Sequence, residues 1–215
     1  MVNFNGVLAA HDSNIITQNR AFLYGDAVFE TVKIMDSKVL FLEDHYFRLM
    51  SSMRVVRMEI PMNFTMEFLE EQILDLAKNK KISHSSRARI TVFRNEGGYY
   101  LPILNSVSFL ISVESLDNQM YLMDKNPYQV ELFTDFYITK QLLSSIKTTN
   151  KIINVTASIF ANENGFDNCL LLNDTKNVVE ALQGNIFMLS GNQLITPPIS
   201  EGCLNGVMRK QIIHL

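Results

Sequence analysis

The fold of the first half of the chain is decided by residues 23–34, LYGDAVFETVKI. The β-branched residues of this stretch predict a strand over residues 26–34. The run MDSK at residues 35–38 then predicts a tight turn, followed by a return strand over residues 39–42. The chain is therefore expected to enter its first lobe as an antiparallel sheet.

Helical and strand periodicities follow the hairpin. An acidic pair at residues 43–44 marks the start of a helix, since acidic groups stabilise the positive end of the helix dipole. After Pro61, a second apolar face predicts another helix over about residues 66–77. Alternating side chains then predict strands over residues 87–93 and 107–113. The first half thus combines strands with two consecutive helices.

A polar, turn-rich segment at residues 117–127 is interpreted as a linker between two lobes. The lobes are an N-terminal α/β lobe, residues 1–116, and a C-terminal lobe, residues 128–215. In the second lobe we expect a strand over 128–134, a helix over about 149–164, strands over 169–172, 185–189 and 194–196, and a helix over 207–215. The residues of the first of these helices expected to face the core are Ile152, Val155, Ile159 and Phe160. The pattern predicts an α+β, or mixed α/β, fold with a cleft between two lobes.

Composition excludes several classes of protein. The 215 residues carry 19 Lys and Arg against 22 Asp and Glu, which argues against nucleic acid as a partner because such binding needs a concentrated basic surface. No apolar run approaches the ~20 residues of a membrane span, and the first residues lack a secretory signal pattern. Cys169 and Cys203 have no partner at metal-ligand spacing. We therefore expect a cytoplasmic protein with reduced, buried thiols and no metal site.

Two residues of the second half could carry covalent chemistry. Lys147 lies among hydroxyl residues just before a helix, where a deprotonated lysine could form a Schiff base. Taken alone, such a lysine is more commonly a solvated loop residue. Glu180 lies between apolar residues and a glycine turn, and could pair with a protonated ring nitrogen or end a strand in water.

Two further features could bind an anion. Arg48 lies in the first helix, where its guanidinium could bind a phosphate or pair with Asp44. Nearby His45 is interpreted as structural rather than as a general base. Residues 204–209, LNGVMR, form a glycine turn that runs into a helix, and free N–H groups at such a helix start can bind phosphate.

Five segments together, in this order, resemble the class IV aminotransferase family. These are the fold-type-IV pyridoxal-phosphate enzymes, which include branched-chain and D-amino-acid aminotransferases and 4-amino-4-deoxychorismate lyase. The matching segments are LYGDAVFET at residues 23–31, HYFRL at 45–49, IKTTN at 146–150, EALQGNIF at 180–187 and LNGVMR at 204–209. The resemblance implies a two-lobed D-amino-acid-aminotransferase-like fold with pyridoxal 5'-phosphate in the cleft between the lobes.

The resemblance also implies roles for individual residues. Lys147 would be the catalytic residue, forming an aldimine with the cofactor and moving protons. The residues that would bind the cofactor are Arg48, Glu180, Asn185, Val207 and Met208, with Glu180 on the pyridine nitrogen. The residues that would line the substrate pocket are Phe29, Arg94, Tyr99, Tyr100 and Leu182. A homodimer is expected from the family, whose active sites borrow a loop from the partner.

Departures from the family pattern bear on the subfamily. Ile152 stands where branched-chain enzymes carry a tyrosine, and Met208 replaces a threonine of the phosphate turn. Lys151 after the IKTTN motif is similar to some deoxychorismate lyases, but Tyr99 stands about where those lyases carry an arginine. The paired tyrosines suggest a substrate with an aromatic or apolar portion, and Arg94 could anchor its carboxylate.

Three functions follow from these observations. The first is transfer of the amino group of an α-amino acid to a 2-oxo acid. The alternative is lyase chemistry on an amino-chorismate, which releases pyruvate and gives 4-aminobenzoate for folate synthesis. The third is a non-catalytic relative that keeps the fold. Family members usually run some tens of residues further. Two interpretations follow: the sequence is a fragment of a longer protein, or the second lobe is incomplete and a partner covers its exposed core. The fragment, with the second lobe truncated at its C-terminal end, is the preferred interpretation.

Overall fold

The computed structural model describes residues 2–9, 18–82, 85–117 and 126–215. The chain divides into two compact units. The first unit contains Met1–Leu122 and Lys147–Thr149, and the second contains Met123–Ile146 and Asn150–Leu215. Most of the predicted linker, residues 117–127, lies outside the described residues, so the lobe boundaries of the sequence analysis stay predictions.

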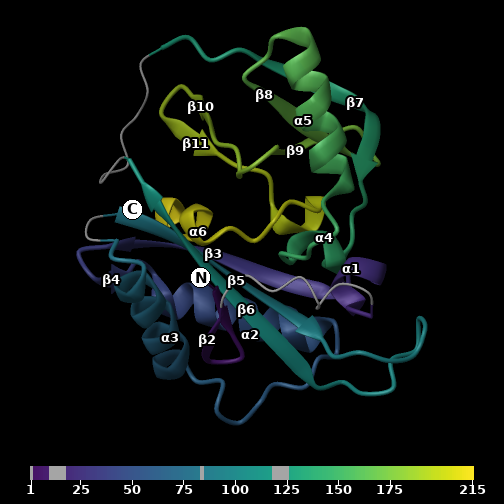
Figure 1. Ribbon diagram of the computed structural model, residues 1–215. Helices are drawn as coiled ribbons and strands as arrows, with labels where there is room; N and C mark the ends of the chain where they lie inside the picture. Colours follow the sequence, from purple (N-terminus) through teal and green to yellow (C-terminus); the bar gives the residue numbers. More distant parts are fainter. Residues whose placement is uncertain (1, 10–17, 83–84, 118–125) are drawn as a thin grey trace. The chain divides into compact units, whose positions relative to one another are not determined.

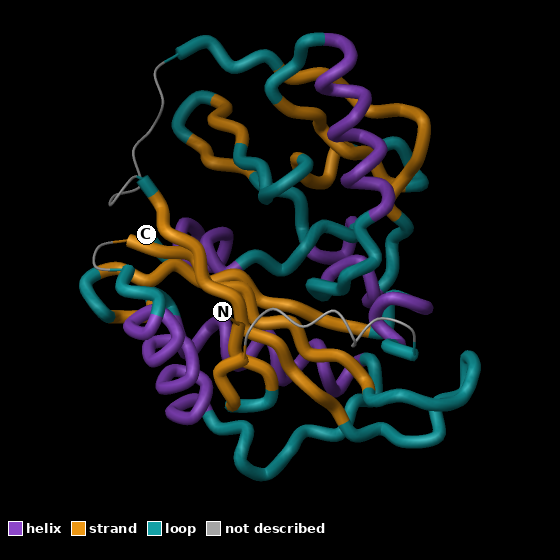
Figure 2. Tube along the Cα trace, in the orientation of Figure 1, coloured by secondary structure: helices purple, strands orange, loops and turns teal. Residues whose placement is uncertain are grey.

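A six-stranded antiparallel sheet with the order β2-β1-β6-β5-β3-β4 is the framework of the first unit (Figures 1 and 2). Its strands are β1 Val2–Phe4, β2 Val7–Ala9, β3 Ala27–Met35, β4 Lys38–Val39, β5 Ser85–Arg94 and β6 Val107–Leu116. The short β4 pairs only with Ile34 and Met35 of β3. Residues 147–149 lie along the other end of β3, with an antiparallel bridge between Thr148 and Val28.

Two helices pack against one face of this sheet, as Figure 1 shows. They are α2 Leu42–Val55 and α3 Met66–Asn79, and a short helix, α1 Arg20–Tyr24, precedes β3. Thr65 caps α3 by accepting a hydrogen bond from the Phe68 N–H, as a threonine before a helix commonly does. The core joins buried helix residues such as Met53 and Leu76 to alternate strand residues such as Val92. Because side chains alternate along a strand, Phe29 and Arg89 belong to the opposite face of the sheet.

The second unit has a smaller sheet in the order β7-β8-β9, in which β7 and β8 are parallel and β9 is antiparallel to β8. Its elements are β7 Val130–Ile138, α4 Leu142–Ser145, α5 Ile152–Asn164, β8 Asn168–Asn173, β9 Val178–Ala181, β10 Met188–Ser190, β11 Gln193–Ile195, a 3-10 turn Ile199–Glu201 and α6 Val207–Ile213. Helix α5 connects the two parallel strands and packs on this sheet through Ala157 and Ala161. Gly165 ends α5 with a left-handed φ of 73°, which glycine adopts without a Cβ clash.

The mixed α+β class is confirmed, as are β3, α2, α3, β5, β6, β8 and α6 within a few residues. The return strand predicted over residues 39–42 is wrong beyond Val39, because α2 begins at Leu42. The predicted strand over residues 185–189 is displaced, since β10 begins at Met188. Strands β1, β2 and β9 and helix α1 were not predicted. No helix in the described ranges has the length and apolar character needed to cross a membrane.

The predicted inward face of α5 is wrong. Ile152, Val155 and Ile159 are 71%, 50% and 52% exposed, whereas Ala157 and Ala161 are buried. Of the predicted set, only Phe160 packs against the core. Small alanine side chains let the helix approach the sheet closely, so the face with the larger residues is turned away from it.

Candidate functional site

Lys147 is held by its backbone against β3 in the first unit. The Phe29 N–H donates to the Lys147 carbonyl at 2.8 Å, and the Thr149 N–H donates to the Ala27 carbonyl at 3.1 Å. The Thr149 hydroxyl also donates to the Gly25 carbonyl at 3.2 Å. This short piece of strand pairing fixes where the lysine side chain starts, although the surrounding sequence shows no strand pattern.

The Lys147 amine and the Arg89 guanidinium both contact the ring of Phe29. Lys147 Nζ is 4.6 Å from the centroid of the Phe29 ring, and the guanidinium carbon of Arg89 is 3.7 Å from the same centroid. Burial lowers the pKa of Arg89, and the neighbouring charge of Arg87 lowers it further. One aromatic ring is therefore contacted by both an amine and a guanidinium. Two cationic groups on one ring suit a substrate that carries an anionic group.

Arg89 was not among the residues predicted from the sequence. It also lines a small cavity of about 120 Å³ together with Thr31, Arg87, Ser112 and Glu114. Strand alternation could have placed Arg87 and Arg89 on one face, but only the pairing of Arg89 with Thr31 brings it beside Phe29. The missed signal was the pair of arginines at positions 87 and 89, two residues apart in a strand.

Arg48 of α2 forms a buried ion pair with Glu30 of β3. Its Nε donates to Glu30 Oε1 at 2.7 Å and its Nη2 donates to Oε2 at 2.6 Å, while His45 Nδ1 lies 2.7 Å from Oε2. Burial alone would raise the pKa of Glu30, but hydrogen bonds and charge from Arg48 and His45 outweigh it and lower that pKa. The bidentate contact fixes the plane of the guanidinium. His45 thus has a structural contact, as the sequence indicated.

Glu180 anchors the glycine turn of the second unit. It is buried on β9, and its Oε2 accepts a hydrogen bond from the Leu204 N–H at 2.8 Å. Its negative charge raises the pKa of Lys151, but the larger effect of burial leaves the pKa of that lysine lowered. This hydrogen bond therefore fixes the Glu180 carboxylate relative to the turn that precedes α6.

The turn itself depends on Asn185 and Gly206. Asn185 Nδ2 donates to the Leu204 carbonyl at 2.7 Å, and a Cβ on Gly206 would lie 2.0 Å from Asn185 Oδ1. Gly206 has an ordinary φ of −72°, so glycine is required here by close packing rather than by backbone conformation. Helix α6 begins at Val207, and the first N–H groups of a helix have no acceptor within it.

The family model described as "Amino-transferase class IV" matches residues 27–215. The chain belongs to the class IV aminotransferase family. Among curated relatives, a putative branched-chain-amino-acid aminotransferase of Methanocaldococcus jannaschii is 27% identical over 204 residues, covering 95% of this chain and 70% of that protein. A D-alanine aminotransferase of Bacillus licheniformis is 23% identical over 233 residues, covering 100% of this chain and 74% of that protein.

Solved structures confirm the class IV aminotransferase fold. A branched-chain aminotransferase of Thermoproteus uzoniensis matches with a TM-score of 0.85 and 21% identity over 99% of this chain and 73% of that chain. A putative 4-amino-4-deoxychorismate lyase of Legionella pneumophila matches with a TM-score of 0.80 and 22% identity over 92% of this chain and 70% of that chain. At these identities the likeness establishes the fold and leaves the reaction to be argued from the residues.

In this class IV aminotransferase the remaining predicted pocket residues differ in exposure: two are exposed and two are buried. Tyr99 and Tyr100 are 84% and 89% exposed. Leu182 is buried in the apolar core of the second unit, which accounts for it as a packing residue. Arg94 is buried and donates to Asp26, to Asn105 and to the carbonyls of Val56 and Arg57, just after α2. These contacts occupy the guanidinium that was expected to anchor a substrate carboxylate.

The predicted cofactor residues form one set in each unit. Arg48 and the catalytic Lys147 belong to the first unit, as does Phe29, which was predicted to line the substrate pocket; Glu180 and the turn before α6 belong to the second. In the second set, Val207 is buried and Met208 is 42% exposed. Asn185 contacts the backbone of the turn, so its amide shapes the turn from which the first N–H groups of α6 project.

Proposed function

We propose that this chain is a pyridoxal-phosphate enzyme that transfers the amino group of an α-amino acid to a 2-oxo acid, with Lys147 as its catalytic residue. The observation that carries the proposal is the placement of Lys147. Its backbone is paired with β3, and its amine contacts the ring of Phe29, which the Arg89 guanidinium also contacts. A solvated loop lysine would need neither the strand pairing nor the aromatic contact.

The donor set fits pyridoxal phosphate. A lysine amine suits the aldehyde of the cofactor, a buried carboxylate suits its ring nitrogen, and helix N–H groups suit its phosphate. Glu180 is buried and already fixed by the Leu204 N–H, and a Cβ on Gly206 would disturb the turn before α6. When bound, pyridoxal phosphate supplies a ring that withdraws electrons from the α-carbon of the amino acid.

In this proposal Lys147 transfers protons, and the other residues bind the cofactor and the substrate. Lys147 Nζ takes the proton from the α-carbon and delivers a proton to C4′ of the cofactor. Glu180 keeps a proton on the ring nitrogen, while Arg48 and the N–H groups of Val207 and Met208 hold the phosphate. Arg89 places a positive charge on the Phe29 ring that Lys147 also contacts, where it favours the carboxylate of an amino-acid substrate.

A second candidate is the lyase reaction on an amino-chorismate. Two sequence features favour it: Ile152 stands where branched-chain enzymes of the family carry a tyrosine, and the IKTTN motif is followed by a basic residue, Lys151, as in some deoxychorismate lyases. The two reactions differ in their need for an acceptor. An aminotransferase turns over only when a 2-oxo acid is present, whereas the lyase releases pyruvate from amino-deoxychorismate without one.

A homodimer and a cytoplasmic location belong to the same proposal. Several apolar side chains are exposed on one loop of the first unit, namely Tyr99, Tyr100, Leu101, Ile103 and Leu104. Exposed apolar patches of this kind mark interaction surfaces. Cys169 and Cys203 are free and buried, as suits a reducing compartment.

The test is to locate the lysine that reacts with the cofactor. The purified chain is mixed with pyridoxal phosphate, reduced with borohydride and digested, and the modified peptide is identified by mass spectrometry. We expect the pyridoxyl group on Lys147 and its loss in Lys147→Ala, with Lys78→Ala on α3 as the matched control. Absence of uptake, or equal modification of surface lysines, would contradict the proposal and leave the non-catalytic relative.

A further inference from the structure

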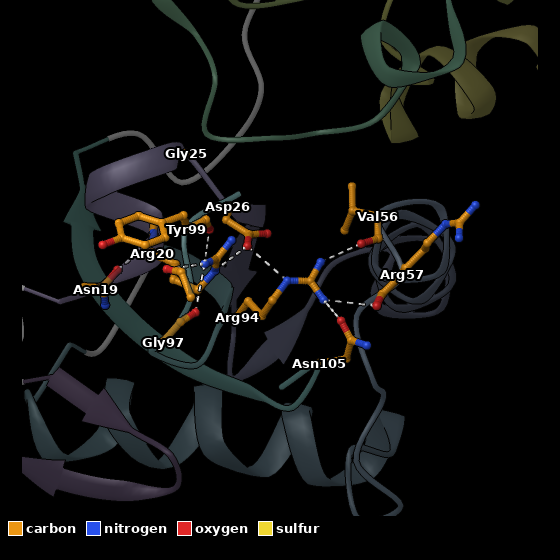
Figure 3. Close-up of polar contacts among 12 residues, drawn as sticks. Asn19, Arg20, Gly25, Asp26, Val56, Arg57, Arg94, Gly97, Tyr99 and Asn105 are labelled. Carbon is orange, nitrogen blue, oxygen red and sulfur yellow. Dashed lines mark hydrogen bonds and ion pairs between the residues drawn. The ribbon is translucent and has the colours of Figure 1, made fainter. Parts of the chain in front are cut away.

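One carboxylate joins two buried arginines just before β3 (Figure 3). Asp26 Oδ2 accepts from Arg20 Nε at 2.9 Å and from Arg94 Nε at 3.0 Å. The arginine side chains are 3% and 7% exposed and the aspartate side chain 16%. Removing one partner of a buried charge cluster leaves the other charges uncompensated, so the three side chains hold one another in place.

The main chain of Asp26 is held by the same two arginines. The pairing of β3 with β5 begins at Ala27, so Asp26 lies just beyond the ladder. There the Arg94 N–H donates to the Asp26 carbonyl at 3.3 Å, and the Asp26 N–H donates to the Arg20 carbonyl at 3.3 Å. Because the ends of elements open more readily than their middles, anchors of this kind decide how well the start of β3 is ordered.

The segment that carries Lys147 pairs with this same end of β3. The two carbonyls that flank Asp26 belong to Gly25 and Ala27, and their oxygens lie 3.2 Å and 3.4 Å from the Thr149 hydroxyl. The Thr149 N–H also donates to the Ala27 carbonyl at 3.1 Å. Residues 147–149 and β3 belong to one compact unit. The lysine segment is therefore attached to the peptide groups on either side of Asp26.

The place of the Lys147 amine depends on this attachment. A lysine amine is carried on a flexible four-carbon stem, so it is positioned only as well as its backbone and its contacts allow. Its contact is the ring of Phe29, which belongs to the strand that Asp26 anchors. A shift of about 1 Å in a reacting group can cost about 100-fold in rate. Disorder at the start of β3 would displace both the backbone of the lysine and the ring that its amine contacts.

We propose that Asp26 is a positioning residue for Lys147. With Arg20 and Arg94 it fixes the start of β3, and Thr149 joins the lysine segment to that fixed backbone. The inference rests on the proposed function, because it concerns the lysine of that reaction. A merely structural role would lower stability alone, whereas the positioning role also lowers the reactivity of one amine, that of Lys147.

The experiment measures how fast pyridoxal phosphate labels Lys147. The full chain is mixed with the cofactor and reduced with borohydride at intervals, and the labelled peptide is quantified by mass spectrometry. We expect Asp26→Asn to slow the labelling about tenfold, because a neutral amide does not compensate two buried guanidiniums. Ile73→Ala on α3 is the control, since it empties a buried site away from β3's start and should leave labelling within about twofold.

Variants of Thr149 test whether the effect of Asp26 passes through this residue. Thr149→Val removes the hydroxyl but keeps the branched shape, and should slow labelling about fivefold, as the loss of one hydrogen bond does. Thr149→Ser keeps the hydroxyl and should label within about twofold of wild type. Combining Asp26→Asn with Thr149→Val should slow labelling little more than Asp26→Asn alone. Fully additive effects, about fiftyfold together, would overturn the inference.

Amide exchange in the chain without added cofactor gives a second, independent measurement. In Asp26→Asn the Phe29 and Thr149 N–H groups should exchange about tenfold faster, relative to amides in the middle of β3. Unchanged exchange at these two groups would overturn the inference. Faster exchange with an unchanged rate of labelling would do so as well, because the order of the strand would then not matter for the amine.

Failures of the two proposals can be told apart. A wild-type chain labelled at Lys147 whose Asp26→Asn variant is labelled at the same rate overturns only the positioning role. A wild-type chain that takes up no pyridoxal phosphate overturns the proposed function and this inference with it. If Asp26→Asn fails to fold, Arg20→Lys takes its place, because it keeps a positive charge opposite Asp26 but loses the fixed guanidinium geometry.

Discussion

The two units bury their apolar residues to different extents. In the first, α2 and α3 turn residues such as Met53 and Leu76 fully into one core against the sheet. In the second, α5 buries two alanines and leaves Val155 and Ile159 about half exposed. The difference teaches that the first unit completes its core from its own elements, whereas the second carries an apolar surface that its described elements do not cover.

The units also hold their charged groups differently. Glu30 of the first unit is buried and accepts hydrogen bonds from Arg48 and His45. Glu201 of the second unit is 23% exposed and accepts from Lys140, Asn173 and Asn177. A carboxylate paired with charged groups in a buried site should be far more sensitive to substitution than one that accepts from a lysine and two amides near water.

The largest effect is expected at the buried cluster. Glu30→Gln leaves Arg48 with no counter-charge at this contact and should lower the free energy of unfolding by about 4 kcal/mol. Urea denaturation measures the change. Arg87→Gln, which breaks an exposed ion pair with Glu114, serves as the control and should cost less than about 1 kcal/mol. Equal losses in the two variants would show that burial does not set the difference.

A matched pair of substitutions tests the two cores. Ile73→Ala on α3 empties a site that is 1% exposed and should cost about 3 kcal/mol. Ile159→Ala on α5 changes a residue that is 52% exposed and should cost less than about 1 kcal/mol. Both are measured by urea denaturation. A large loss at Ile159 would mean that this face of α5 is covered in solution.

A pair of glycine substitutions tests the turn before α6. Gly206→Ala brings a Cβ against Asn185 and should weaken pyridoxal-phosphate binding by about tenfold, because the Asn185 amide must shift away from its hydrogen bond to the Leu204 carbonyl. Gly184→Ala is the control, since a Cβ there meets nothing within 4 Å. Spectroscopic titration with the cofactor measures both. Unchanged affinity for the cofactor in Gly206→Ala would show that the turn before α6 does not bind its phosphate.

The smallest effect is expected from Glu201→Gln and depends on pH. Hydrogen bonds from Asn177, Lys140 and Asn173 lower the pKa of Glu201 from 4.5 to about 2. A carboxylate with a lowered pKa stabilises the fold fully above its unfolded pKa, and the stabilisation is lost as the pH falls through the folded pKa. The difference in stability between wild type and Glu201→Gln should therefore be constant near neutrality and shrink between pH 4.5 and about pH 2. A difference that stays constant to pH 2 would contradict this.

Sequence patterns predicted much of the first unit because its elements follow simple periodicities. Strand β3 and helices α2 and α3 each turn one apolar face to the same core, so local spacing reports the buried side. The same reasoning failed on α5, where both faces carry apolar residues. Spacing then shows that a helix forms but not which face packs, because packing depends on how closely the helix approaches the sheet.

The sequence by itself determined the family, through five short segments in order, and named Lys147, Glu180 and Arg48 as candidates. Only the tertiary structure decided their surroundings: the pairing of Lys147 with β3, the Arg89 guanidinium on Phe29, and the bond from Leu204 to Glu180. It also joined Arg94 to Asp26, which lies 68 positions earlier in the chain. The physical reason is that residue types and spacing report local conformation, whereas hydrogen bonds and ion pairs between distant segments form only when the chain packs.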